Sequence, residues 1–313
     1  MSENKTAIVF PGQGSQSLGM LGGLSASYSQ IQETFEEASD ALGRDLWALA
    51  QEGPVEALNQ TQNTQPLVLT ASIAMWRVLK SQLDVQPTLM AGHSLGEYSA
   101  LVCSDSLSFV EAVKLVEQRA QFMQQAVPEG EGAMAAILGL SVDALIDICQ
   151  QAAEGDVVSA VNFNAPGQVV IAGNIAAVTR AMGLAKDQGA KRALPLPVSV
   201  PSHCALMLPA AEKLLAVMSA VEFNSPNVPV LHNTDVAEHT DANGIRAALG
   251  KQLHTPVRWV ETVESLVKSN VNTVIECGPG KVLSGLNKRI DKSLGLYSVG
   301  DEGSFNKTIE ALS

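Results

Sequence analysis

A serine inside the segment GHSLG, residues 92–96, is better placed by its neighbours to act as a nucleophile than any other residue of the chain. The segment fits G-x-S-x-G, the sharp turn between a strand and a helix that exposes a serine hydroxyl, here that of Ser94. The apolar run at 87–91 predicts the strand, and residues 95–104 predict the helix. Free N–H groups at the start of such a helix favour developing negative charge. The alternative is a glycine-rich packing turn whose serine only caps the helix.

A serine nucleophile needs a neighbouring base, and the chain offers five histidines. His203 is the preferred base because it follows the apolar run LPLPVSV, where the chain returns from a predicted insertion. A histidine in that position would face a cleft between domains. The alternative is a capping or core histidine. His93 lies inside the turn, where a neighbouring side chain points away from the nucleophile. No acidic residue stands out as the third member of a triad, so Asp235 and Asp241 are candidates only by default. The remaining histidines lie in polar or strand-end contexts: His232, His239 and His254.

Two backbone N–H groups are candidates for stabilising an oxyanion. Gln13 follows the predicted strand at 6–10 in the glycine-containing turn PGQG, and it can aim its N–H into a cleft at the carboxyl ends of the strands. With the N–H of Leu95 it would complete an oxyanion hole. The alternatives are a plain glycine turn and a phosphate-binding loop, although the turn lacks the lysine of a P-loop.

Arg119 lies on a predicted amphipathic helix at 108–126, at the edge of the apolar face and close to Val116 and Met123. A charge in that position is costly unless it is paired. One interpretation is an arginine that extends its head to water. The other is a fixed cation that awaits an anionic ligand group, because a guanidinium binds a carboxylate through two hydrogen bonds.

The order of predicted elements indicates an α/β fold with an inserted unit. Strands that alternate with helices predict a parallel sheet covered on both faces. The break PEGEG at 128–132 begins a segment with the order β-α-β-β-α-β, which is the ferredoxin-like unit. We therefore expect a catalytic core at 1–129 and 199–313 and a ferredoxin-like subdomain at 130–198. Further strands are expected at 133–138, 157–162, 168–172, 191–196, 228–233 and 273–276, and further helices at 29–42, 65–82, 141–153, 174–188 and 257–269, with one more after 278–280.

Composition limits the class of protein. The chain has 313 residues and a formal net charge of −12, which argues against nucleic-acid binding because that requires a basic surface. No run reaches the ~18 apolar residues of a membrane span, and the start MSENKTAIVF lacks the apolar stretch of a signal peptide, so we expect a cytoplasmic protein without membrane association. No C-x-x-C pair occurs, which favours reduced structural thiols. Cys204 is a disfavoured alternative nucleophile, because no sharp glycine-flanked turn between a strand and a helix surrounds it. The cysteines are Cys103, Cys149, Cys204 and Cys277.

Five motifs together resemble the bacterial malonyl-CoA:acyl carrier protein transacylase family. The similarity runs nearly end to end, and the motifs occur in the family's order and spacing, which makes the combination highly specific. It implies a hydrolase-like α/β core that carries a ferredoxin-like subdomain. The motifs are PGQGSQ at 11–16, GHSLGE at 92–97, Arg119, PSH at 201–203 and GPG at 278–280.

The resemblance implies a role for each candidate site residue. Ser94 would be the nucleophile and His203 the base. His203 would be oriented by the backbone carbonyl of Gln252 rather than by an acid, which would explain the missing triad carboxylate. The backbone N–H groups of Gln13 and Leu95 would bind the oxyanion. Arg119 would bind the malonyl carboxylate.

The implied reaction is ping-pong transfer of a malonyl group from malonyl-CoA, through an ester on Ser94, to the phosphopantetheine thiol of acyl carrier protein, for fatty acid synthesis. Neither a metal nor a bound cofactor is implied. The open alternatives are a trans-acting malonyltransferase of a polyketide synthase, a serine esterase or thioesterase, and a non-catalytic carrier-binding module. An esterase or thioesterase has no need for a buried arginine.

The resemblance also implies a small acidic carrier protein as partner. Because this chain is itself acidic, a local basic patch must steer the encounter. Our first candidate patch is formed by Lys281, Lys288 and Arg289, and the second by Lys191 and Arg192. The alternative for each is an ordinary solvated surface.

Overall fold

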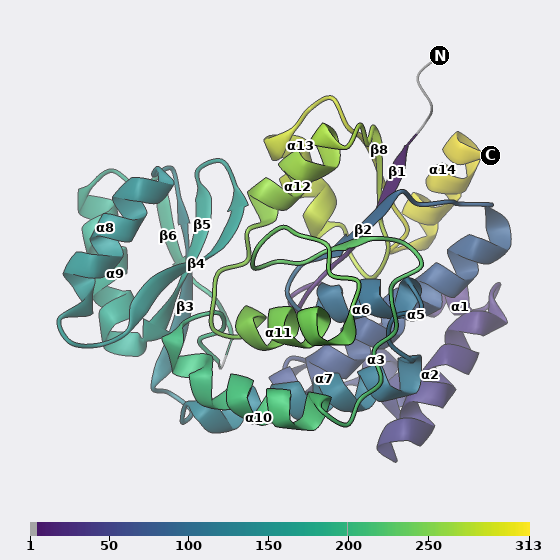
Figure 1. The fold of residues 1–313 in the computed structure, drawn as a ribbon, viewed down its shortest axis with the longest axis horizontal. Helices are drawn as coiled ribbons and strands as arrows, with labels where there is room; N and C mark the ends of the chain where they lie inside the picture. The colour runs from purple at the N-terminus through teal and green to yellow at the C-terminus, as the bar shows by residue number, and fades with distance from the viewer. Residues whose placement is uncertain (1–4, 199) are drawn as a thin grey trace.

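The computed structural model describes residues 5–198 and 200–313, and these ranges contain two β-sheets (Figure 1). The larger sheet has five strands in the order β7-β2-β1-β8-β9, and every adjacent pair is parallel. The predicted parallel sheet is therefore confirmed. Its strands are β1 (Thr6–Phe10), β2 (Leu89–Gly92), β7 (Val230–Leu231), β8 (Thr273–Glu276) and β9 (Gly295–Ser298).

Helices cover both faces of this sheet because its central strands are apolar on both sides. Along β1, Ile8 and Phe10 enter one hydrophobic core, whereas Ala7 and Val9 enter a second core on the opposite face. The first core includes α2 (Ser29–Leu42), α5 (Thr61–Gln82), α6 (Gly96–Cys103), α7 (Phe109–Ala126), α10 (Leu208–Met218), α11 (Ala242–Gln252) and α14 (Glu302–Leu312), and the second includes α12 (Trp259–Lys268) and α13 (Val282–Ile290).

The helices α5 and α7 show where sequence patterns locate a helix end well and where they do not. The helix α7 begins after Ser108, whose side chain accepts a hydrogen bond from the N–H of Glu111, as an N-cap residue does. The helix α5 begins at Thr61 rather than at the predicted residue 65, so Pro66 lies inside it. An interior proline removes one helical hydrogen bond, but nearly all of the first half of α5 is buried, and this packing outweighs the local cost.

The smaller sheet has four strands in the order β4-β5-β3-β6, and every adjacent pair is antiparallel. Its helices α8 and α9 pack on one face, at the left of Figure 1, and the chain order β-α-β-β-α-β confirms the predicted ferredoxin-like unit. The domain boundaries at 129/130 and 198/199 stay predictions, and residue 199 is outside the described residues. The elements of this unit are β3 (Gly132–Leu138), α8 (Val142–Ala153), β4 (Val158–Ala165), β5 (Gln168–Asn174), α9 (Ile175–Asp187) and β6 (Arg192–Pro195).

Several elements of the structure were not predicted from the sequence. Most are short or glycine-containing, so their hydrophobic periodicity is weak. Within the described ranges, no helix is both long and apolar enough to cross a membrane. The elements that the patterns missed are α1 (Gly22–Ser25), α3 (Leu46–Glu52), α4 (Val55–Leu58), a 3₁₀ helix (Ala205–Met207), α10, α11, β9 and α14.

Candidate active site

The turn between β2 and α6 has the geometry of a nucleophile elbow. Ser94 at its tip has a φ of 52°, a left-handed conformation that a non-glycine residue adopts only at a cost. A Cβ atom on Gly92 would lie 1.9 Å from the backbone of Gly96, and one on Gly96 would lie 2.1 Å from the carbonyl oxygen of Phe10. Both flanking positions therefore require glycine, and the predicted elbow is confirmed.

Asn233, just after β7, clamps this strained turn from the side. Its Oδ1 accepts a hydrogen bond from the N–H of Ser94 at 2.6 Å, and its Nδ2 donates to the carbonyl oxygen of Gly92 at 2.6 Å. Sequence reasoning missed Asn233, because nothing in the local pattern shows that β7 lies beside β2.

The structure brings Ser94, His203 and Gln252 together from three distant parts of the chain. The Nε2 atom of His203 lies 2.8 Å from Ser94 Oγ, and its Nδ1 atom lies 2.7 Å from the backbone carbonyl oxygen of Gln252. A carbonyl oxygen only accepts, so Nδ1 carries the proton and Nε2 is free to take one from the serine. Burial, with the nearby charge of Arg119 as a second cause, lowers the pKa of His203 to about 3. The imidazole is therefore neutral at physiological pH.

The two acidic residues considered for a triad have other partners. Asp235 contacts His239 at 2.9 Å, and Asp241 caps the first turn of α11. Within the described residues, no carboxylate contacts His203. The default assignment of either aspartate is therefore wrong, and a backbone carbonyl occupies the orienting position.

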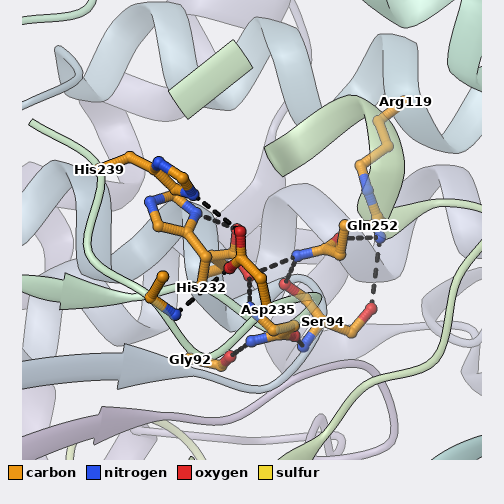
Figure 2. A network of polar contacts seen from close by, with 10 residues as sticks. Gly92, Ser94, Arg119, His232, Asp235, His239 and Gln252 are labelled. Atoms are coloured by element: carbon orange, nitrogen blue, oxygen red, sulfur yellow. Dashed lines mark hydrogen bonds and ion pairs between the residues drawn. The ribbon is translucent and has the colours of Figure 1, made fainter. Parts of the chain in front are cut away.

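Arg119 is 1% exposed, so the alternative in which its head reaches water is wrong. Its Nη1 donates to Gln65 Oε1 at 2.7 Å. Its Nη2 donates to Gln252 Oε1 at 3.0 Å and to Ser94 Oγ at 3.3 Å (Figure 2). Burial lowers the pKa of Arg119 from its ordinary value, and the neighbouring Tyr98 and Glu97 oppose that shift. An arginine stays protonated under such a shift. A fixed positive charge therefore lies beside the nucleophile.

Gln13 and Leu95 line the same cavity of about 100 Å³ as Ser94, Arg119 and His203. In the part of the chain that the structure describes, the backbone N–H of neither residue donates a hydrogen bond to the protein. Two unpaired donors beside a serine hydroxyl are what an oxyanion hole requires.

A second cavity of about 180 Å³ adjoins the first, and the two share Gln13, His93, Asn162 and Leu196 in their walls. His93 contacts Asn164 Oδ1 through Nε2 at 2.8 Å, so its ring turns away from Ser94 as expected. The second cavity reaches residues of α13. Together the two cavities could hold an extended substrate arm that leads from the nucleophile towards α13.

The remaining site candidates lie elsewhere. Cys204 is buried, its Sγ donates to the carbonyl oxygen of Pro201, and burial raises its pKa to about 11, which excludes a reactive thiolate. His232 is fully buried against Glu97, a residue that sequence analysis did not single out. The signal was present: Glu97 is a charged residue at the start of an otherwise apolar helix. Within the described residues, no group of three or more side chains is arranged to hold a metal ion.

The site combines a serine at a nucleophile elbow, a buried neutral histidine and two free N–H groups on an α/β fold. These features define an acyl-transfer enzyme with a serine nucleophile. Residues 7–293 match the model of the acyl transferase domain family. The chain belongs to this family.

Several known proteins are similar to this chain over nearly its whole length. The malonyl CoA-acyl carrier protein transacylase of Haemophilus influenzae is 58% identical over 309 residues, which are 98% of this chain and 99% of that protein. The solved structure of the transacylase of the same name from Coxiella burnetii has a TM-score of 0.97 and 51% identity, and covers 99% of this chain and 98% of that one. A malonyl-transacylase solved in complex with a type II polyketide synthase acyl-carrier protein has a TM-score of 0.97 and 54% identity, with 98% and 100% covered.

Proposed function

We propose that this chain transfers a malonyl group from malonyl-CoA to the phosphopantetheine thiol of acyl carrier protein. The observation that carries the proposal is the buried Arg119, which is held by two amide oxygens and by the hydroxyl of Ser94. A guanidinium in this position would bind the carboxylate of a malonyl group while the thioester carbonyl lies at the serine. The names of the closely similar proteins support the same substrates.

The reaction proceeds in two halves through one covalent intermediate. His203 takes the proton from Ser94, whose Oγ attacks the thioester carbonyl, and the N–H groups of Gln13 and Leu95 bind the oxyanion. The intermediate collapses, coenzyme A leaves as the thiol with the proton from His203, and Ser94 retains a malonyl ester. The carrier thiol then gives its proton to His203 and attacks this ester, and Ser94 Oγ leaves with that proton as the free hydroxyl, so His203 is neutral again.

The basic surface around α13 differs from the predicted patch, because Lys292 joins it and Arg289 has other partners. Lys281, Lys288 and Lys292 line one surface groove beside α13. Arg289 instead donates hydrogen bonds to Gln168 and to the carbonyl oxygen of Pro166, in the turn between β4 and β5. We propose that the three lysines form the docking surface for an acidic carrier protein, around the same helix, α13, that also contributes to the second cavity. Arg289 would contribute charge to the edge of this surface.

Fatty acid synthesis is the pathway that we propose, with a cytoplasmic location. The four cysteines are free and buried, which fits a reducing compartment. A second candidate role, malonyl supply to a polyketide synthase, is favoured by the similar protein that was solved with a polyketide carrier. Its chemistry at Ser94 is identical, and only the carrier differs.

Product analysis tests the proposed function. The protein is mixed with malonyl-CoA, with and without the holo form of a fatty-acid carrier protein or a polyketide carrier protein, and malonyl-carrier, free malonate and coenzyme A are measured. We expect malonyl-carrier as the main product and little free malonate. Rapid release of malonate that carrier protein does not suppress would identify a thioesterase and contradict the proposal. The carrier with the higher kcat/KM identifies the pathway.

A further inference from the structure

A buried glutamate follows the elbow directly and lies outside both cavities. Glu97, the second residue of α6, is 0% exposed. Its Oε1 accepts from His232 Nδ1 at 2.7 Å, and its Oε2 accepts from the N–H of Asn233 at 2.9 Å and from Gln252 Nε2 at 3.0 Å. Both carboxylate oxygens are therefore satisfied, which a buried carboxylate requires.

The partners of Gln252 allow its side-chain amide only one orientation. Its Nε2 donates to Glu97 Oε2 and to the carbonyl oxygen of Ser94, both at 3.0 Å, and these two groups only accept. Its Oε1 accepts from Nη2 of Arg119, which only donates. A rotation of the amide by half a turn would place donor against donor and acceptor against acceptor at these contacts. Figure 2 shows Gln252 between Arg119 on one side and Ser94 on the other.

The orientation of Gln252 decides what Arg119 can do. Within the described residues, no carboxylate contacts the guanidinium, whose acceptors are two amide oxygens and the serine hydroxyl. An amide oxygen holds a cation in place without neutralising it, so the charge stays available for an anionic acyl group. A directly paired carboxylate would compete with that group. Glu97 contacts Arg119 only through the amide of Gln252, and together with the carbonyl oxygen of Ser94 it holds the Nε2 end of that amide away from the guanidinium.

We propose that Glu97 is a positioning residue that sets the preference for a carboxylated acyl group by fixing Gln252 and, through it, Arg119. The inference rests on the proposed function, because it takes Arg119 as the residue that binds the malonyl carboxylate. Glu97 itself does not touch the substrate. Its contribution is a carboxylate oxygen that holds the donor end of the amide away from the guanidinium.

The direct test compares how fast Ser94 is acylated by malonyl-CoA and by acetyl-CoA, followed by intact mass. In Glu97→Ala the amide keeps the carbonyl oxygen of Ser94 but loses its charged acceptor. The ratio of kcat/KM for malonyl-CoA to that for acetyl-CoA should then fall by about tenfold, the scale of one charge-assisted hydrogen bond. In Glu97→Gln one side-chain oxygen can still accept from Gln252 while its amide nitrogen faces His232, whose ring can adopt the other tautomer. The ratio should then recover to within about threefold of the wild-type value.

A second variant keeps the test decisive if Glu97→Ala does not fold. Gln252→Met retains the backbone carbonyl that orients His203 and removes only the amide. It should lower the same ratio, and combining it with Glu97→Ala should lower the ratio no further, because both changes interrupt one connection.

Glu276 provides a matched control. It is also a 0% exposed glutamate, at the end of β8, and its oxygens accept from the N–H groups of Leu283 and Ser284 at 3.0 and 2.7 Å, at the start of α13. Glu276→Ala should lower the melting temperature and leave the malonyl-to-acetyl ratio unchanged.

Three results would overturn the proposal: an unchanged ratio in folded Glu97→Ala, an unchanged ratio in Gln252→Met, or an equal fall in Glu276→Ala. The last would show a general response to loss of a buried glutamate. If the wild-type protein forms no malonyl-serine adduct, the proposed function fails instead, so the two failures are distinguishable.

Discussion

At Ser94, two groups contact the side-chain hydroxyl and a third holds the backbone. His203 accepts from the hydroxyl at 2.8 Å, Arg119 donates to it at 3.3 Å, and Asn233 holds the backbone N–H. The base is neutral because of its burial and the neighbouring cation. The nucleophile therefore stands between a proton acceptor and a positive charge, which favours an alkoxide-like oxygen during attack.

The lowered pKa of His203 predicts an unusual acid limb. An ordinary histidine with a pKa near 6.5 would be mostly protonated at about pH 5, whereas His203 with a pKa of about 3 remains a base. We expect kcat/KM for malonyl-CoA, measured by acylation kinetics, to stay constant as the pH is lowered through 6.5. Near-ultraviolet circular dichroism at each pH confirms that the protein is still folded. An acid limb centred near 6.5 would contradict this expectation.

The same shift makes stability depend on pH. In the unfolded chain the histidine binds a proton below about pH 6.5, while the folded protein binds one only near pH 3. The unfolded state therefore binds more protons in this window, and the free energy of unfolding should fall as the pH is lowered from about 6.5 towards 3. Urea unfolding of the wild-type protein and His203→Ala measures this contribution. If both proteins lose stability equally, other groups are responsible.

Arg119→Ala tests acyl-group selection at the residue scale. Removing one member of a buried charge pair costs about 2–5 kcal/mol, or roughly 30-fold to several-thousand-fold in kcat/KM for malonyl-CoA. Acetyl-CoA lacks the carboxylate and should lose far less. The measurement is kcat/KM for both thioesters on both proteins. An equal loss for the two would show that Arg119 is structural.

Single residues were predictable where local sequence dictates their environment. The glycines around Ser94 predict the nucleophile. The buried position of Arg119 was one of two interpretations of its place at the edge of an apolar helix face. The clamp by Asn233 and the network of Glu97 were not predictable, because their contacts join residues more than 130 positions apart. Gln252 was assigned only through resemblance, since no local pattern marks a backbone carbonyl.

At the scale of elements, the elbow is the part of the fold with the least tolerance. A methyl group on Gly96 would meet the carbonyl oxygen of Phe10 at 2.1 Å, so Gly96→Ala must displace α6 from β1. We expect a loss of about 2 kcal/mol or more in the free energy of unfolding, together with most of the activity. Denaturant unfolding and acylation kinetics measure the two effects.

Gly183 in α9 is the matched control for this substitution. Among the residues that the structure describes, none places a heavy atom within 4 Å of a Cβ atom built there outside the helix's own backbone, and the residue lies inside a helix. Gly183→Ala should stabilise the protein by about 0.4–1 kcal/mol and leave activity unchanged. A similar loss of stability in both variants would show that crowding at the elbow is not the cause.

Elements with strong periodicity or caps were predicted to within a few residues, as α7 and α8 show. The short β7 and the glycine-containing α11 depend on tertiary packing for their existence. The sequence patterns located the first but predicted it too long, at 228–233, and they missed the second. The chain just after β7 supplies Asn233 to the site, and the end of α11 supplies Gln252. The least predictable elements therefore deliver the supporting residues.

At the scale of the whole molecule, the parallel sheet supplies Ser94 and the chain that follows β6 supplies His203, so the cavity lies between the two sheets. The chain carries a net charge of −12, so an acidic carrier must find a local basic surface. Charge reversal in Lys288→Glu combined with Lys292→Glu should raise KM for carrier protein and leave KM for malonyl-CoA unchanged. Steady-state kinetics with each substrate varied in turn measures this.

Two comparisons make the docking test specific. Lys307→Glu, on α14, introduces the same charge change outside the patch and should have little effect on KM for carrier protein. Lys191→Glu combined with Arg192→Glu tests the second candidate patch. If that pair raises KM for carrier protein and the α13 pair does not, the docking surface lies on the smaller sheet.

The most direct test of malonyl transfer through a serine ester is the intact mass of the protein after brief mixing with malonyl-CoA, without carrier protein. We predict one malonyl adduct, mapped to Ser94 by peptide mass, absent in Ser94→Ala and lost from the wild-type protein when holo carrier protein is added. Coenzyme A release without any adduct, or an adduct that persists in Ser94→Ala, would contradict a malonyl-serine intermediate at this site.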